Sequence, residues 1–138
     1  MPEKRTLQKA RAAKRRGKSP STQAGAFVEE EIHHVREGKH GARSTKQIIA
    51  IGLSKARRAG VPLPPPGPSR AKKATRKSAE RDYEIGQGRR KPRKASAKRR
   101  RAISQALKRE PRSTVSKKAL SRQAKAARPR RSRNARAR

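Results

Sequence analysis

The side chains best able to hold a metal or move a proton lie close together in the sequence. His33, His34, His40, Glu30 and Glu37 are the candidates, and His33 and Glu37 are one helical turn apart. The order His-Glu-x-x-His, which places two ligands and a general base on one helix face, is absent. The glutamates find simpler partners in neighbouring histidines and arginines. We therefore predict no metal site.

Catalysis and cofactor binding have still less support. The chain contains no cysteine, which excludes a disulfide framework, a thiolate metal site and a cysteine nucleophile. No nucleophile–base pair is evident, and a chain so poor in apolar residues is not expected to form a catalytic cleft. The sequence predicts a non-enzymatic protein with no catalytic residues and no cofactor.

Positive charge is the dominant chemical property of the chain. Its 138 residues include 43 Lys and Arg but only 9 Asp and Glu, for a net charge of +34. Residues 61–138 hold 28 of these basic residues and 4 of the acidic ones. Because Lys and Arg neutralise phosphates and release condensed counterions, such an imbalance predicts a polyanionic partner.

The nature of that polyanion follows from the aromatic content. Aromatic residues make up 1% of the chain, which argues against recognition of single strands by base stacking. Duplex DNA, or structured RNA, held by its backbone fits better. The predicted nucleic-acid-binding residues are Arg43, Lys46, Arg57, Arg58, Arg89, Arg90, Lys91, Lys98, Arg99, Arg100, Arg101, Lys117, Lys118, Arg130 and Arg131.

Apolar residues are too few to order the whole chain. They amount to 29%, against roughly 45–50% in ordinary domains, so burial cannot offset the entropy of folding everywhere. They gather in residues 21–61, for which we predict a small antiparallel helical hairpin. Residues 1–20 are expected to form a disordered basic arm, 62–68 a polyproline spacer, and 69–138 a basic tail.

The first predicted helix of the hairpin spans about residues 24–37. Ser21 or Thr22 is its expected N-cap, and Gly38 is expected to end it in the left-handed conformation. The apolar residues that recur at helical spacing, here and in the second helix, form the predicted core. These are Phe27, Val28, Ile32, Val35, Ile48, Ile49, Leu53 and Val61.

The second predicted helix spans about residues 45–59. Ser44 and Gln47 have the spacing of a capping box, and Gly60 supplies a stop signal before a proline. Gly52 falls on the apolar face, where the absence of a side chain would let the first helix approach closely.

Three residues of the hairpin carry more specific predictions. Glu31 and Lys55 fall within the two apolar arcs, so we predict that they pair across the hairpin; alternatively, Lys55 extends its ammonium to solvent. Ile51 points away from the main apolar stripe, towards Arg58. Its exposure suggests a covering partner, and a homodimer forming a four-helix bundle is one solution.

The basic tail contains three weaker helical patterns, at about residues 70–83, 94–109 and 114–127. Ser69 is the expected cap of the first, and Ser113 or Thr114 that of the last. Each has only a thin apolar edge, so we expect these helices to form on binding.

The block AGAFVEEEIHHVREGKHGARSTKQIIAIGLSKARRAGVPLP resembles the core of a bacterial domain-of-unknown-function family of small, very basic proteins. The later segment PRSTVSKKALSRQAKAA resembles a C-terminal element of the same proteins. The resemblance implies no established activity. The tails are similar to histone-like tails in composition only.

These patterns together predict largely sequence-independent nucleic-acid binding, with histone-like compaction or bridging of DNA in the bacterial nucleoid and a cytoplasmic location. Two alternatives stay open. One is a ribosome- or RNA-associated basic protein, and the other is a protein-interaction adaptor tethered to DNA. No apolar run approaches the roughly 18 residues of a membrane span, so no membrane partner is expected.

Overall fold

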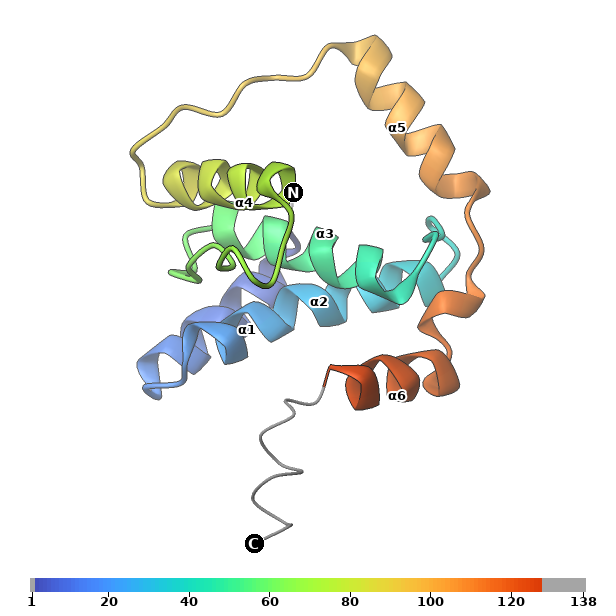
Figure 1. Cartoon of the computed structure of the whole chain (residues 1–138), viewed down its shortest axis with the longest axis horizontal. Coiled ribbons are helices and arrows are strands. Elements are labelled where there is room, and N and C mark those ends of the chain that lie inside the picture. Colours follow the sequence, from blue (N-terminus) through green and yellow to red (C-terminus); the bar gives the residue numbers. More distant parts are fainter. Residues whose placement is uncertain (1, 128–138) are drawn as a thin grey trace, which may run out of the picture.

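The computed structural model describes residues 2–127, and within them the protein is helical, with no strand (Figure 1). The predicted helical fold class is confirmed. None of the helices in this part of the chain combines the length and apolar character that a membrane crossing requires. The elements are α1 (Lys4–Arg15), α2 (Pro20–Arg36), α3 (Thr45–Arg58), α4 (Lys73–Gly86), α5 (Ala97–Arg109), the 3₁₀ turn η1 (Ser113–Val115) and α6 (Lys117–Ala126).

The helices are arranged around α2 and α3, which pack against each other in the middle of the molecule (Figure 1). Helix α1 lies along α2, and α4 packs on α3. The turn η1 and helix α6 contact the same central pair. Helix α5 stands apart from this body at the far side of a long connection.

Helix α2 begins earlier than the sequence suggested. Its cap is Ser19, not Ser21 or Thr22: the Ser19 Oγ accepts a hydrogen bond from the Thr22 N–H at 3.3 Å. Pro20 fills the first helical position, where the missing N–H has no helical partner to lose. The predicted end is confirmed, since Gly38 adopts φ +80° just after the helix.

Helix α3 begins at the predicted cap. The Ser44 Oγ accepts a hydrogen bond from the Gln47 N–H at 3.2 Å. The Gln47 side chain does not complete the capping box, however, because its Oε1 accepts from the Arg43 N–H at 2.7 Å. The stop at Gly60 is confirmed by its φ of +101°.

The close approach at Gly52 is also confirmed. A Cβ atom built there would lie 2.7 Å from the Val28 Cα, so only a residue without a side chain lets the two backbones meet. The predicted pair of Glu31 and Lys55 forms across this contact, with the Lys55 ammonium on the buried Glu31 carboxylate.

Two apolar clusters fill the space between the helices. The first contains Ala10, Ala24, Phe27, Ala56 and Val61, with Leu7, Leu53 and Leu63 packed against it. The second contains Val35, Ala42, Ile48 and Val115, with Ile32 against it. Of the eight predicted core residues, Phe27, Val35, Ile48 and Val61 are buried, and Val28, Ile32, Ile49 and Leu53 are half-buried.

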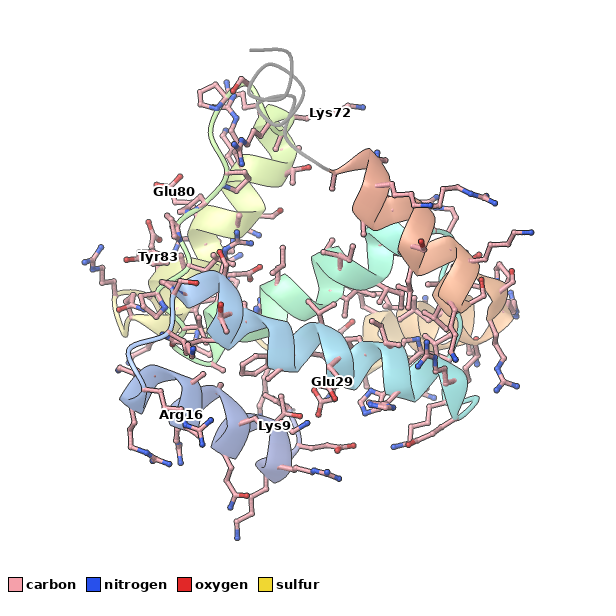
Figure 2. All side chains as sticks on the ribbon, turned by 90° about the horizontal axis from the view of Figure 1, so that it is seen from below. Lys9, Arg16, Glu29, Lys72, Glu80 and Tyr83 are labelled. Carbon is pink, nitrogen blue, oxygen red and sulfur yellow. The ribbon has the colours of Figure 1, made fainter. Side chains whose placement is uncertain are left out.

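Within the predicted disordered arm, residues 4–15 form helix α1, which folds onto α2. Its apolar edge, Leu7 and Ala10, joins the first core cluster. Its basic side meets the acidic side of α2: Figure 2 shows Lys9 reaching Glu29, 3.3 Å from Nζ to Oε1. Contacts with α2 thus neutralise part of the positive charge that had suggested a solvated arm.

Helix α4 covers the remaining face of α3. The buried Asp82 accepts hydrogen bonds from the Ser54 Oγ at 2.7 Å and the Arg58 Nε at 2.8 Å. Ile51 lies one helical turn before Ser54 on the same face of α3 and is half-buried. Helix α4 thus packs over the face of α3 that carries Ile51, and the homodimer stays a prediction.

The C-terminal part returns to the central helices from the last turn of α5 onward, which the prediction of a free basic tail did not anticipate. The Gly41 N–H donates to the Leu107 carbonyl at 2.8 Å, and the Ala42 N–H donates to the Pro111 carbonyl at 2.9 Å. Val115 is buried in the second core cluster. Helices α4, α5 and α6 correspond to the three weak helical patterns but begin at Lys73, Ala97 and Lys117, after the caps Lys72, Ser96 and Ser116.

Replacing Gly52 with alanine should separate α2 from α3, because the new Cβ meets backbone and not a flexible side-chain end. We expect a loss of about 1–3 kcal/mol in the free energy of unfolding, measured by urea titration. Gly25→Ala is the matched control, since nothing lies within 4 Å of its Cβ position in α2. It should gain roughly 0.5–1 kcal/mol from helix propensity. Equal effects of the two substitutions would contradict the close approach.

Acid should weaken the docking of α1 on α2. A hydrogen bond from His34 lowers the pKa of Glu3, and one from Lys9 lowers the pKa of Glu29, both from an ordinary value near 4.5. Because the folded state favours the ionised carboxylates, their contribution is complete above that value and is lost as pH falls through the lowered pKa.

The NMR signals of Ala10 should therefore shift towards those of an undocked helix as the solution is acidified below about pH 4.5. The variant Glu29→Gln should show a weaker dependence on pH, because one of the two titrating contacts is gone. Signals of α1 that do not respond to acid in the wild-type protein would count against these contacts.

Candidate nucleic-acid interface

A hollow of about 830 Å³ lies where the end of α4 and the segment after it face the start of α5. We call it the basic hollow, because seven of its lining residues are cations. No carboxylate residue of the described chain lines it; its other lining residues are Ile85, Ala95 and Ser96. The seven cations are Arg58, Arg81, Arg90, Lys91, Arg93, Lys94 and Arg99.

The local sequence explains why the segment between α4 and α5, which lines the basic hollow, forms no helix. Gly88, with φ +77°, ends α4, and Pro92 prevents the chain from resuming a helix at once. The chain then runs without secondary structure to Ser96, as the long connection in Figure 1 shows. There the Ser96 Oγ accepts a hydrogen bond from the Arg99 N–H at 3.2 Å and caps α5. The connection exposes each of its basic side chains.

The charge of the basic hollow is mostly uncompensated. Arg58 pairs with Asp82, and Arg90 pairs with Glu84, each at 2.8 Å from Nε to a carboxylate oxygen. None of the other five cations forms an ion pair within residues 2–127. The N-terminus of α5 adds the partial positive charge of a helix end to the same place. The basic hollow therefore attracts anions, and phosphates in particular.

The structure gathers only some of the predicted binding residues here. Arg58, Arg90, Lys91 and Arg99 line the basic hollow, and Arg89 is exposed beside it in sequence. Helix α5 has no buried residue, so the basic run that includes Arg99 faces solvent all around it. The other members of that run are Lys98, Arg100 and Arg101.

Other predicted residues are exposed elsewhere. Arg43 and Lys46 flank the start of α3, at the opposite end of that helix from Arg58. Lys117 and Lys118 are exposed in the first turn of α6. The predicted residues Arg130 and Arg131 lie outside the described residues.

Arg57 does not belong to a binding surface, which corrects the sequence prediction. It is only 8% exposed, and its guanidinium donates to the carbonyls of Leu63 and Pro64, each at 3.2 Å. Burial lowers the pKa of Arg57, and the Asp82 carboxylate opposes that effect. The side chain fastens the proline-rich segment to α3, so its hydrogen bonds are used within the fold.

Three cations of the basic hollow were missed from the sequence. Arg93 and Lys94 continue the basic block 89–91 beyond Pro92, so extending that block across the proline would have found them. Arg81 lies one turn before Ile85 on α4. Nothing in the sequence indicated which face of this helix would turn towards α5.

In comparisons with known proteins, no family model matches the chain, and neither a curated protein nor a solved structure shows significant similarity to it. The resemblance of the central block to a bacterial family of small basic proteins stays a prediction.

Neutralising three unpaired cations of the basic hollow should weaken binding of duplex DNA more than the same loss of charge elsewhere. For the triple variant Lys91→Gln, Arg93→Gln and Lys94→Gln, we expect at least about a tenfold weaker affinity at low salt. The dependence of affinity on salt should also become shallower by about 2–3 in its logarithmic slope. Fluorescence anisotropy with a labelled duplex measures both quantities.

The matched control neutralises three exposed cations at the end of α1 and directly after it, namely Lys14, Arg15 and Arg16. It lowers the net charge by the same amount, and none of these residues lines the basic hollow. If the two triple variants lose the same affinity, the basic hollow has no special part in binding.

Proposed function

We propose that this protein is a non-enzymatic nucleic-acid-binding protein that holds the sugar–phosphate backbone with little regard for base sequence. The observation that carries the proposal is the basic hollow. It gathers seven cations, five of which have no carboxylate partner among the described residues. Positive charges held together without counter-charges favour a ligand that brings several negative charges at once.

The extent of the basic surface supports a long polyanion over a small one. The basic hollow ends at the first turn of α5, where Arg99 belongs to both. Helix α5 continues the charge outward with four consecutive basic residues, 98–101, and buries none of its side chains. A single small anion would engage only part of this surface, whereas successive backbone phosphates could follow it.

The aromatic residues give no support to base recognition. Phe27 is 1% exposed in the core, and Tyr83 is half-buried on α4. Base stacking needs open aromatic faces, and the chain has no other aromatic residue to offer. Contacts to phosphate are therefore the mode of binding that the residues favour.

Bridging or compaction of DNA in the nucleoid is the biological role that we propose. Exposed cations occur in places other than the basic hollow, at the start of α3 (Arg43 and Lys46) and of α6 (Lys117 and Lys118). Separate basic surfaces allow one molecule to contact two duplexes. Cytoplasmic location follows from that role and belongs to the proposal.

Affinity for DNA should fall steeply with salt. If the seven cations of the basic hollow each neutralise one phosphate, the logarithm of the association constant should decline with the logarithm of salt concentration with a slope of about −6 or steeper. Protein freed of nucleic acid should be titrated into duplexes of unrelated sequence, which should bind about equally well.

Two results would contradict the proposal: binding that persists in molar salt, or strong preference for one duplex sequence. An RNA duplex in the same titration separates the two polyanions. Tighter binding of RNA than of DNA would favour a ribosome- or RNA-associated role over compaction of DNA.

A further inference from the structure

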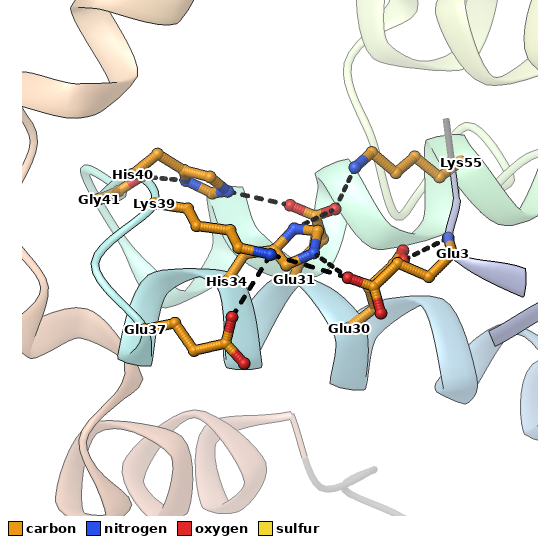
Figure 3. Close-up of polar contacts among 9 residues, drawn as sticks. All are labelled: Glu3, Glu30, Glu31, His34, Glu37, Lys39, His40, Gly41 and Lys55. Carbon is orange, nitrogen blue, oxygen red and sulfur yellow. Dashed lines mark hydrogen bonds and ion pairs between the residues drawn. The ribbon is translucent and has the colours of Figure 1, made fainter. Parts of the chain in front are cut away.

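Side chains from α2, the turn after it and α3 meet at the buried carboxylate of Glu31, which is 1% exposed (Figure 3). The Lys55 ammonium lies against its Oε1. The His40 Nε2 lies 3.2 Å from its Oε2, and the His34 Nδ1 lies 3.7 Å from its Oε1. We call Glu31, His34 and His40 the Glu31 cluster. None of these contacts is used by the proposed nucleic-acid interface.

The position of the proton on His40 follows from its outer contact. The His40 Nδ1 lies 2.9 Å from the Gly41 carbonyl oxygen, which can only accept a hydrogen bond. The proton therefore sits on Nδ1. The His40 Nε2 lies within hydrogen-bond distance of the Glu31 carboxylate, which when ionised also only accepts, so Nε2 donates a proton there and becomes a ligand only when a metal ion takes the place of that proton.

His34 is fixed in the complementary way. Its Nε2 lies 3.1 Å from the Glu3 Oε1, and this carboxylate is in turn held in place because the Glu3 N–H donates to the Glu30 Oε1 at 2.6 Å. An ionised carboxylate only accepts, so the His34 proton sits on Nε2. The lone pair of the neutral ring is then on Nδ1, which faces Glu31.

Once a metal ion displaces the proton between His40 and Glu31, the pocket offers three electron-pair donors, namely one carboxylate and two imidazole nitrogens. One ligand atom each from Glu31, His34 and His40 can be chosen so that all three lie within 4.8 Å of one another. At zinc-to-ligand distances of about 2.0–2.1 Å, a tetrahedral ion separates its ligands by about 3.3 Å. The His40 Nε2 lies 3.2 Å from the Glu31 Oε2 and the His34 Nδ1 lies 3.7 Å from the Glu31 Oε1, so each imidazole is near that separation from one of the two carboxylate oxygens.

We propose that the Glu31 cluster binds a divalent transition metal, with Zn²⁺ as the best fit. Two imidazoles and one carboxylate suit Zn²⁺ and exclude Mg²⁺ and Ca²⁺, which prefer oxygen ligands alone. Outer hydrogen bonds from ligand histidines to a backbone carbonyl and to a carboxylate are typical of metal sites. Here the Gly41 carbonyl and Glu3 fill these two positions.

Lys55 supplies the competing cation. Its ammonium is bonded to the Glu31 carboxylate, so an entering ion has to share that carboxylate or displace the ammonium. The competing explanation of the cluster is that both imidazoles are protonated and form ion pairs with Glu31, with no metal. The two explanations differ in whether a metal binds and in which nitrogens it touches.

The experiment uses the full chain, free of nucleic acid and made without a histidine tag. Zn²⁺ is titrated in competition with a chromophoric chelator, and Co²⁺ is used as a spectroscopic probe of coordination. We expect one ion per chain and an intense tetrahedral Co²⁺ absorption band. His34→Ala and His40→Ala should each weaken binding at least about tenfold, whereas Lys55→Met should tighten it.

His33→Ala is the matched control, because this neighbouring histidine is exposed and its one ion pair within residues 2–127 is with Glu29, at 3.6 Å. It should leave affinity unchanged. If wild-type protein binds Zn²⁺ no better than His34→Ala and His40→Ala, the metal site is wrong and the cluster is an imidazolium–carboxylate network.

A second measurement covers the case in which a histidine variant fails to fold. In the wild-type protein, Zn²⁺ should shift the ¹⁵N resonances of His34 Nδ1 and His40 Nε2 and leave those of His33 in place. Resonances that do not respond, or that respond equally for all three histidines, would overturn the proposal.

Discussion

The contact between α2 and α3 at Gly52 is the constraint on which the rest of the structure depends. Because no side chain intervenes there, the two backbones approach until a Cβ would lie 2.7 Å from the Val28 Cα. That approach brings Lys55 to the Glu31 carboxylate and lets the two small apolar clusters close around the pair. Helix α1 packs on α2, and helices α4 and α6 pack on α3, whereas α5 does not pack on this pair.

Much of the central pair could be predicted from sequence because its signals are local. Helical spacing of apolar residues, the cap at Ser44 and the glycines at 38 and 60 each depend on neighbours within one or two turns. The pair of Glu31 and Lys55 was predictable because both residues interrupt an apolar arc. The cap at Ser19 was not predicted, although a serine followed by a proline suits the N-cap and the first position of a helix.

What could not be predicted depends on contacts distant in sequence. Leu7 and Ala10 alone give too small an apolar surface to predict a docked helix. In the structure they pack in one cluster with Phe27, which is distant in sequence. The sequence around Arg57 is that of a surface cation, because the carbonyls that accept its hydrogen bonds belong to the proline-rich segment that folds back onto α3. The basic hollow and the Glu31 cluster arise in the same way, from segments whose meeting no local pattern specifies.

The return of the chain after α5 has a thermodynamic consequence. The Gly41 and Ala42 amides bind the carbonyls of residues 107 and 111 to the turn between α2 and α3. The segment from the end of α4 to residue 111 is therefore anchored to the folded body at both ends. A segment anchored at both ends loses less conformational entropy on binding a ligand than a free segment of equal charge. Its cations are already confined near one another before any ligand arrives.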